Sequence, residues 1–129
     1  MPTPLRDVRI LVLDDTRTIR IVVSKLLRLA GALVHETSEP AEAVALAVSD
    51  PFDVVLSDIV MPEMTGYDVA RTLRRAGVGS LLIAMTAMTR EEDVQLALES
   101  GFDLQLGKPL DTDGLADTIA EALANKRRS

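Results

Sequence analysis

Residues 8–15 read Val8-Arg9-Ile10-Leu11-Val12-Leu13-Asp14-Asp15, an apolar run that stops abruptly at two carboxylates. Apolar side chains at successive positions, rather than at alternate ones, are typical of a parallel strand that is covered on both faces. Gly31 lies where the C-terminal cap of a helix is expected. Between Asp15 and Gly31, apolar residues recur at helical spacing and predict a helix with one apolar stripe: Ile19, Val22, Val23, Leu26 and Leu27.

The same alternation of strand and helix recurs four more times along the chain. Further apolar runs predict strands over residues 32–36, 52–57, 80–85 and 104–106. Thr89 and Glu92 have the spacing of a capping box at a helix start. The four remaining helices are predicted from Ser38-Glu39-Pro40 to Asp50-Pro51, over 67–76, from Thr89 to Ser100, and over 111–125. Their core-facing residues are predicted to be Ala41, Val44, Ala45 and Val48, then Val69, Ala70 and Leu73, and finally Leu115, Ile119, Ala122 and Leu123.

Five strand–helix units in succession predict one parallel sheet with helices on both faces, because right-handed crossovers place helices above and below it. The expected fold class is α/β, a three-layer α/β/α sandwich around a five-stranded parallel sheet. We expect a single domain over residues 1–129, with its core at about 8–125 and a frayed, solvated basic tail at 126–129.

The composition excludes several classes of protein. The chain has no Cys, which rules out a disulfide framework, a zinc ribbon and a thiol nucleophile. Its 14 Lys plus Arg against 20 Asp plus Glu argue against nucleic acid as the main partner, and aromatic residues at 2% provide no stacking platform. No apolar run is long enough to span a bilayer, and the N-terminus lacks the pattern of a signal peptide, so a cytoplasmic location away from membranes is expected.

Charged and polar residues follow the predicted strands at the point where each strand ends. Asp14 and Asp15 follow the first strand, Asp58 the third, Thr86 the fourth and Lys108 the fifth. Each has an ordinary alternative: the first two could cap a helix, and the others could lie in turns. Because sites in open α/β sheets form outside the carboxyl ends of the strands, we expect all five side chains to converge at one edge.

Three neighbouring carboxylates repel one another unless a cation lies between them. Their oxygens suit a hard ion such as Mg²⁺. A carboxylate can also act as the nucleophile towards a phosphoryl group, while Lys108 and Thr86 could hold the charge on the phosphoryl oxygens.

With these residues in place, the chain resembles the receiver domains of two-component response regulators, and the single-domain CheY-like members most closely. The resemblance spans residues 8–125 and implies a flavodoxin-like fold with the strand order 2-1-3-4-5. It also implies a phosphoprotein that signals in a phosphorelay, rather than an enzyme with a separate substrate. The motifs that carry it are Ile10-Leu11-Val12-Leu13-Asp14-Asp15, Leu56-Ser57-Asp58-Ile59-Val60-Met61-Pro62-Glu63-Met64-Thr65-Gly66, Thr86-Ala87 and Lys108-Pro109.

The resemblance implies a role for each site residue. Asp58 is expected to be the phospho-acceptor, with Asp15 as a direct ligand of Mg²⁺ or Mn²⁺, Asp14 as a ligand through water, and the backbone carbonyl of Val60 as a further ligand. Thr86 is expected to bond the phosphoryl group and shift on activation. Lys108 is expected to pair with the phosphoryl group, and the bond before Pro109 to be cis. The donor would be a sensor histidine kinase or a histidine phosphotransfer protein, and the readout a changed face of the fourth helix, fifth strand and fifth helix that binds a downstream protein.

The chain departs from the family pattern at Gln105, where the family usually has an aromatic residue that moves with the threonine. We therefore expect the Thr86 half of the switch to remain and the aromatic half to be lost or altered. The apolar residues Val60 and Met88 flank the acceptor, and we expect them to change the lifetime of the phosphoryl group. The one histidine of the chain, His35, lies on the predicted second strand, away from the carboxylates, and is expected to have no role in the site.

Other functions fit the sequence less well. A phosphatase of the haloacid-dehalogenase type needs a second Asp two residues after the nucleophile, where this chain has Thr16 or Val60. A flavodoxin-like electron carrier needs a hydroxyl-rich phosphate loop and aromatics around the flavin. A histidine phosphotransfer protein needs its His on a bundle helix, and a degenerate receiver would lack part of the acidic set. Two alternatives stay open. The chain could be a complete single-domain regulator, which the start at Met1 favours, or a receiver domain taken from a larger regulator or hybrid kinase.

Overall fold

Five parallel strands form one sheet in the computed structural model, which describes residues 3–128. The strands are β1 (Arg9–Leu13), β2 (Leu33–Thr37), β3 (Val54–Asp58), β4 (Leu81–Thr86) and β5 (Leu104–Gly107). Each begins and ends within two residues of its predicted range. They are arranged in the order β2-β1-β3-β4-β5, as the resemblance implied. Met1, Pro2 and Ser129, the ends of the predicted domain, lie outside the described residues.

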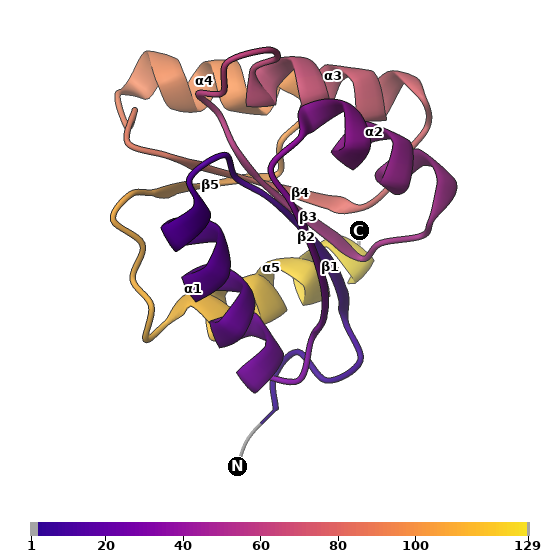
Figure 1. The fold of residues 1–129 in the computed structure, drawn as a ribbon, viewed down its shortest axis with the longest axis vertical. Helices are drawn as coiled ribbons and strands as arrows, with labels where there is room; N and C mark the ends of the chain where they lie inside the picture. The colour runs from indigo at the N-terminus through magenta and orange to yellow at the C-terminus, as the bar shows by residue number, and fades with distance from the viewer. Residues whose placement is uncertain (1–2, 129) are drawn as a thin grey trace.

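Five helices cover the two faces of the sheet and confirm the three-layer sandwich. They are α1 (Arg17–Leu29), α2 (Pro40–Ser49), α3 (Gly66–Arg75), α4 (Glu91–Ser100) and α5 (Leu115–Arg128). Helices α1 and α5 lie on one face, and α2, α3 and α4 lie on the other (Figure 1). Within the part of the chain that the structure describes, none of the helices combines the length and the hydrophobicity that crossing a bilayer requires.

The sheet separates two apolar cores, which explains the unbroken apolar run at residues 10–13. Ile10 and Val12 pack with α1 and α5 residues, whereas Leu11 and Leu13 pack with residues of α2 and α3. All four side chains are fully buried. Successive side chains of a strand point to opposite faces, so both faces of β1 need apolar residues once helices cover both.

The segment before β1 crosses the end of α1 at Gly31. The N–H of Leu5 donates to the carbonyl of Ala30 at 3.0 Å, that of Asp7 donates to the carbonyl of Gly31 at 3.1 Å, and Leu5 is fully buried. Gly31 has φ +100°, in the left-handed region that favours glycine at a helix end. The predicted cap is therefore confirmed, and the N-terminal segment packs against it.

The predicted core face of α2 is wrong at three of its four residues, because Ala41, Ala45 and Val48 are exposed. Val44 is partly buried against the core, as predicted, and the buried residues of the helix are Pro40, Ala43 and Ala47. The segment Pro40–Ser49 carries apolar residues around most of its circumference, so periodicity alone could not decide which side faces the sheet. The predicted faces of α3 and α5 are confirmed at Val69, Ala70 and Leu73, and at Leu115, Ile119 and Leu123, while Ala122 is only partly buried.

Two predicted helix starts are displaced. Helix α4 begins after Arg90 rather than after Thr89, and the Arg90 N–H donates to the carboxylate of Asp93 at 3.3 Å, so Thr89 and Glu92 do not form the predicted capping box. Helix α5 begins at Leu115 because Asp111 is part of a turn, where its Oδ1 accepts the N–H of Asp113 at 3.2 Å. In both cases a carboxylate accepts a free backbone N–H near the helix start, and the observed start lies one or more residues after the predicted one.

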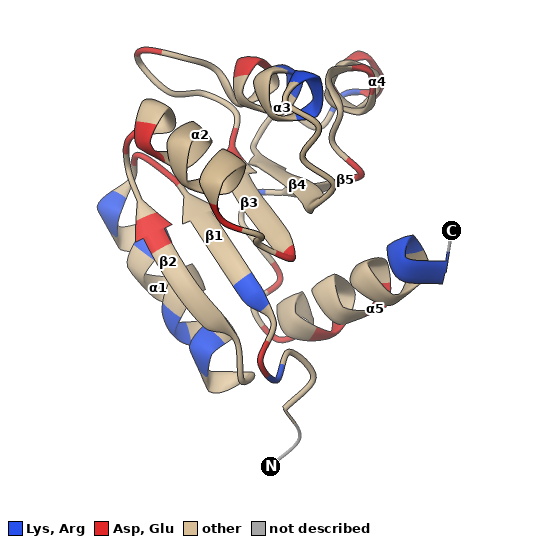
Figure 2. Ribbon diagram, turned by 90° about the vertical axis from the view of Figure 1, so that its right-hand side faces the viewer, with Lys and Arg blue, Asp and Glu red and all other residues tan. Residues whose placement is uncertain are grey.

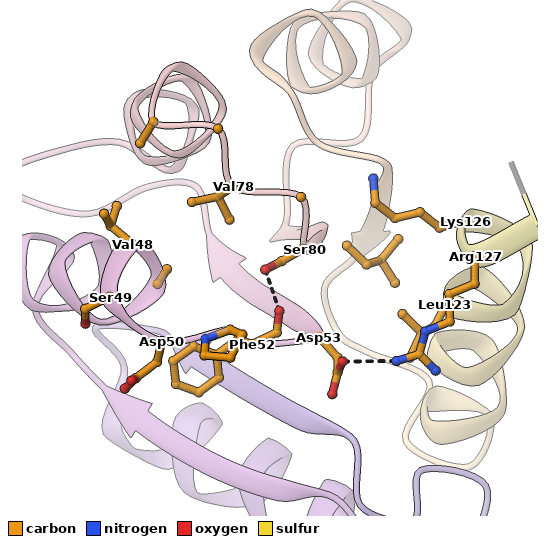
Figure 3. A pocket seen from close by; sticks show the side chains of 16 residues that line it. Val48, Ser49, Asp50, Phe52, Asp53, Val78, Ser80, Leu123, Lys126 and Arg127 are labelled. Atoms are coloured by element: carbon orange, nitrogen blue, oxygen red, sulfur yellow. Dashed lines mark hydrogen bonds and ion pairs between the residues drawn. The ribbon is translucent and has the colours of Figure 1, made fainter.

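The predicted frayed tail at 126–129 is also wrong for its described part. Helix α5 continues to Arg128, and its last turn is held by ion pairs. Lys126 Nζ lies 3.2 Å from Asp103 Oδ1, and Arg127 lies 3.0 Å from Asp53 Oδ1. Figure 2 shows basic residues gathered at this end of α5, and Figure 3 shows the Arg127–Asp53 pair. Cations in the last turn also interact favourably with the helix dipole.

We predict that Gly31→Ala destabilises the fold. A Cβ at this position would lie 2.9 Å from the Cα of Arg6, and the residue would keep a left-handed φ. The expected loss is at least about 1 kcal/mol in the free energy of unfolding, measured by urea denaturation. Gly79→Ala is the matched control, because a Cβ at Gly79 has no atom within 4 Å. Equal effects of the two substitutions would contradict the role given to Gly31.

Candidate functional site

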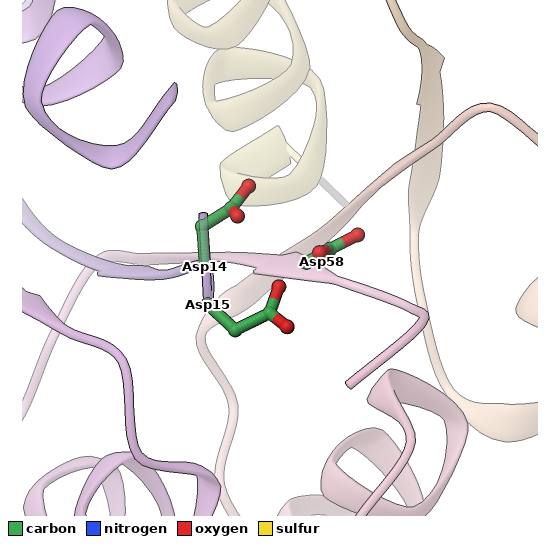
Figure 4. A group of neighbouring side chains, drawn as sticks. All are labelled: Asp14, Asp15 and Asp58. Atoms are coloured by element: carbon green, nitrogen blue, oxygen red, sulfur yellow. The ribbon is translucent and has the colours of Figure 1, made fainter. Parts of the chain in front are cut away.

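Parallel strands bring the predicted site residues to one edge of the sheet. Asp14 follows the last residue of β1, Asp58 ends β3, Thr86 ends β4, and Lys108 follows β5. Asp14, Asp58 and Thr86 are buried, whereas Asp15 is exposed. Carboxylate oxygens of Asp14, Asp15 and Asp58 all lie within 4.8 Å of one another (Figure 4). The carboxylates expected to converge therefore do so.

Asp14 is held in place at three of its oxygens. Its Oδ1 accepts the N–H of Thr16 at 2.8 Å, its Oδ2 pairs with Lys108 Nζ at 3.1 Å, and its carbonyl oxygen accepts a hydrogen bond from Arg20 at 2.9 Å. The alternative in which Asp14 only supports α1 accounts for the contacts with Thr16 and Arg20, because Thr16 precedes α1 and Arg20 lies on it. It does not account for the ion pair with Lys108, which joins Asp14 to the end of β5.

Asp58 is held through one carboxylate oxygen. Oδ1 accepts the backbone N–H of Ile59 at 2.8 Å and lies 3.2 Å from Lys108 Nζ. Among the hydrogen bonds and ion pairs of the described residues, none engages Oδ2 of Asp58. The carboxyl group is therefore fixed in orientation while one of its oxygens stays available.

Burial is the main reason why the pKa of Asp58 lies above its ordinary value, and the negative charge of Asp14 raises it further. The ammonium of Lys108 and the N–H of Ile59 oppose this rise but do not cancel it. The ionised cluster is therefore left with uncompensated negative charge, which is a condition that favours binding of a cation.

Lys108 stays charged although it is largely buried. Burial works against its charged form, but its hydrogen bonds and ion pairs with Asp14 and Asp58 raise its pKa above the ordinary value. The side chain therefore supplies one fixed positive charge between two carboxylates.

The donor set fits a hard divalent cation. All side-chain ligands are oxygens, one of them is on exposed Asp15, and one ammonium neutralises only part of the three negative charges. Val60 follows Asp58 by two residues and is 63% exposed, so its segment borders the same edge. The three carboxylates can therefore serve as ligands of a metal ion.

Thr86 ends β4, the strand next to β3, and Gln105 lies on β5 opposite Ala84; both side chains form hydrogen bonds with the backbone of Met88. The hydroxyl of Thr86 accepts the N–H of Met88 at 3.0 Å, and Gln105 Nε2 donates to the carbonyl of Met88 at 2.9 Å. The peptide bond between Lys108 and Pro109 is cis. His35 is exposed on the edge strand β2 and is absent from the carboxylate cluster, as expected.

Two residues, Gly66 and Arg20, support the site although the sequence patterns gave them no role in it, and Gly66 was noted only as the end of a family motif. A Cβ at Gly66 would overlap the carbonyl oxygen of Asp58 and lie 2.9 Å from the Cα of Ile59, and the Gly66 N–H donates to the carbonyl of Ile59 at 2.8 Å. Arg20 joins the carbonyl of Asp14 to Glu36, 3.5 Å away.

A second hollow, of about 610 Å³, lies at the opposite edge of the sheet between the ends of α2, α3 and α5 (Figure 3). Its polar groups are engaged with one another: Ser80 donates to the carbonyl of Phe52 at 2.6 Å, and Arg127 pairs with Asp53. Among the described residues, the one group of three carboxylates lies at the other edge, with Asp58.

Comparison with known proteins points to one family. The model of the response regulator receiver domain matches residues 10–120. Probable histidine kinase 2 of rice (Oryza sativa subsp. indica) is 31% identical over 134 residues, which are 90% of this chain and 13% of the kinase. Response regulator MprA of Mycolicibacterium vanbaalenii is 34% identical over 122 residues, 95% of this chain and 52% of that protein. The chain therefore spans only part of these relatives.

Solved structures agree with the sequence relatives. The chemotaxis protein CheY4 of Vibrio cholerae is 30% identical, with a TM-score of 0.83 over 90% of this chain and 98% of that chain. A CheY-like receiver domain protein from Methanospirillum hungatei is 25% identical, with a TM-score of 0.87 over 95% of this chain and 98% of that chain.

We predict that Asp58→Asn stabilises the fold when divalent cations are removed. The raised pKa means that the folded state favours protonated Asp58, so its ionised form costs stability, and the cost grows as pH rises through the folded pKa. At pH 7 in a chelator we expect a higher Tm for the variant, and a gain of about 1 kcal/mol would raise it by roughly 3–5 °C. The difference should shrink in acid, where Asp58 itself takes up a proton.

The control is Asp50→Asn, which removes the same charge from an exposed residue far from the cluster. Added Mg²⁺ should raise the Tm of the wild type and of this control more than that of Asp58→Asn. A lower Tm for Asp58→Asn in the chelator would contradict the proposed repulsion.

Proposed function

This chain belongs to the response regulator receiver family of two-component systems, and we propose that it accepts a phosphoryl group from a phosphohistidine onto Asp58. The observation that carries this assignment is the state of the Asp58 carboxylate. It is buried at the end of β3 with Oδ1 held by Ile59 and Lys108, and Oδ2 has no partner among the described residues. A fixed carboxylate with one available oxygen is suited to attack on phosphorus.

In the proposed reaction, Oδ2 of Asp58 forms a bond to phosphorus as the bond between phosphorus and the donor's imidazole nitrogen breaks. The donor's ring is protonated at its other nitrogen, so when the electron pair of the broken bond stays on the first nitrogen the donor leaves as neutral histidine. Water can later attack the same phosphorus, which releases inorganic phosphate and restores the carboxylate. The domain signals through its own modification rather than by turnover of a separate substrate.

The proposed metal ligands are the carboxylates of Asp14, Asp15 and Asp58 together with the backbone carbonyl of Val60. Mg²⁺ or Mn²⁺ held there would neutralise charge on the phosphoryl oxygens. Lys108 would pair with the phosphoryl group from the other side, since its ammonium already lies 3.2 Å from Asp58. The hydroxyl of Thr86 accepts from Met88 and keeps its own proton, which it can donate to a phosphoryl oxygen.

We further propose that the donor docks beside α1. A groove of about 300 Å³, lined mainly by apolar atoms, borders Lys108 and so reaches the edge of the site. Val22, 47% exposed, faces this groove from α1, and Leu110 faces it from the β5–α5 loop. A protein that brings a phosphohistidine to Asp58 has to cover this surface, and burial of its apolar groups would contribute to binding.

The proposed output is a change at the face formed by α4, β5 and α5. Thr86 ends β4 directly before the loop to α4, so movement of its hydroxyl would alter this loop. On α4, Leu96 and Leu98 are 39% and 47% exposed and lie on opposite flanks of the buried Ala97. The proposed target of the changed face is a downstream protein.

Phosphorylation is tested by incubating the protein with a small phosphodonor and Mg²⁺ and measuring its intact mass. We expect a mass increase of one phosphoryl group that is lost in a chelator and in Asp58→Asn. The control Asp50→Asn should be labelled like the wild type. Absence of labelling, also with phosphorylated histidine kinases as donors, or labelling that persists in Asp58→Asn, would overturn the assignment.

Docking is tested with Val22→Glu. The donor is a phosphorylated histidine kinase that labels the wild type. A charge in the proposed apolar contact should slow phosphoryl transfer from this kinase by roughly 10-fold or more, because an unpaired charge would be buried. Labelling by the small donor should not change. Leu29→Glu, at the far end of α1 and 71% exposed, is the control and should leave both rates unchanged. Equal slowing by both variants would argue against this surface.

A further inference from the structure

The backbone of Met88 is held from two sides, by side chains of neighbouring strands. Its N–H donates to the hydroxyl of Thr86 at 3.0 Å, and its carbonyl accepts from Gln105 Nε2 at 2.9 Å. Thr86 is the last residue of β4, and Gln105 lies on β5, opposite Ala84 of β4. The loop that connects β4 to α4 is therefore fastened to both strands at this one residue.

The amide of Gln105 can make this bond in one orientation only. A reversed amide would place Oε1 against the carbonyl oxygen of Met88, and two acceptors cannot form a hydrogen bond. In the observed orientation Oε1 is buried without a partner. An unpaired buried oxygen is unfavourable. Among the described residues, the bond to Met88 is the one hydrogen bond found for the Gln105 side chain, so it is this bond that stabilises the position of the amide.

Movement of Thr86 acts directly on this contact. If the Thr86 hydroxyl turned towards a group on Asp58, the N–H of Met88 would either follow it or lose its acceptor. Following it would pull the carbonyl of Met88 away from Gln105, because both hydrogen bonds belong to one residue. Either path breaks or strains a hydrogen bond that the resting structure contains.

We propose that Gln105 is a positioning residue that holds Thr86 in its resting place by anchoring Met88. The inference rests on the proposed phosphorylation of Asp58, which supplies the group towards which Thr86 would move. It also revises the expectation for the missing aromatic residue. Gln105 does more than remove the aromatic side chain that moves in other family members, because its amide opposes movement of the β4–α4 loop through the hydrogen bond to Met88.

The test is Gln105→Met, which has a similar length and lacks the amide. Binding of beryllium fluoride, a phosphoryl mimic, is titrated by calorimetry in the presence of Mg²⁺. Removing one hydrogen bond of the resting state should tighten binding roughly 2-fold to 10-fold. The affinity for Mg²⁺ alone should not change, which separates this role from a general loss of structure. Gln95→Met makes the same chemical change on the exposed surface of α4 and should bind like the wild type.

A second readout does not depend on the mimic. Hydrogen exchange at the Met88 amide, followed by NMR, should be faster in Gln105→Met than in the wild type and in Gln95→Met. Unchanged exchange, or binding of the mimic that is equal to or weaker than that of the wild type, would overturn the role of Gln105. Failure of the wild type itself to bind the mimic would instead count against the proposed function, and the exchange measurement would still decide the role of Gln105.

Discussion

The two ion pairs of Lys108 are the interaction on which the rest of the site depends. The ammonium lies 3.1 Å from Asp14 and 3.2 Å from Asp58, and so joins the ends of β1, β3 and β5. Two buried carboxylates on neighbouring strands would otherwise repel each other in a medium where charges are poorly screened. One positive charge against three negative ones reduces the repulsion between the buried carboxylates and still leaves the site attractive to a cation.

The site combines a rigid side with a side that can move. On the rigid side, Asp58 is fixed by Ile59 and Lys108, and the absence of a side chain at Gly66 lets the loop after β3 close over its carbonyl. On the other side, the hydroxyl of Thr86 and the amide of Gln105 each contact the backbone of Met88 through one hydrogen bond. Chemistry at the carboxylates requires fixed geometry, whereas a switch requires contacts that can be exchanged at low cost.

Sequence patterns failed where several arrangements bury similar amounts of apolar surface. The apolar residues of α2 surround the helix, so Ala43 and Ala47 could not be distinguished from Ala41 and Ala45. The basic end of the chain was expected to be solvated because its partners, Asp53 and Asp103, are distant in sequence and become neighbours only in the folded chain.

The sequence by itself determined the alternation of strands and helices, the layer architecture and the residues at the active edge. The reason is that apolar runs and strand ends are local signals, and parallel strands necessarily end on the same side. The tertiary structure alone decided that Lys108 lies between Asp14 and Asp58, that Oδ2 of Asp58 stays available, and that Gln105 is bonded to Met88. These contacts join side chains of different strands, and their positions are determined only when the strands and helices pack together.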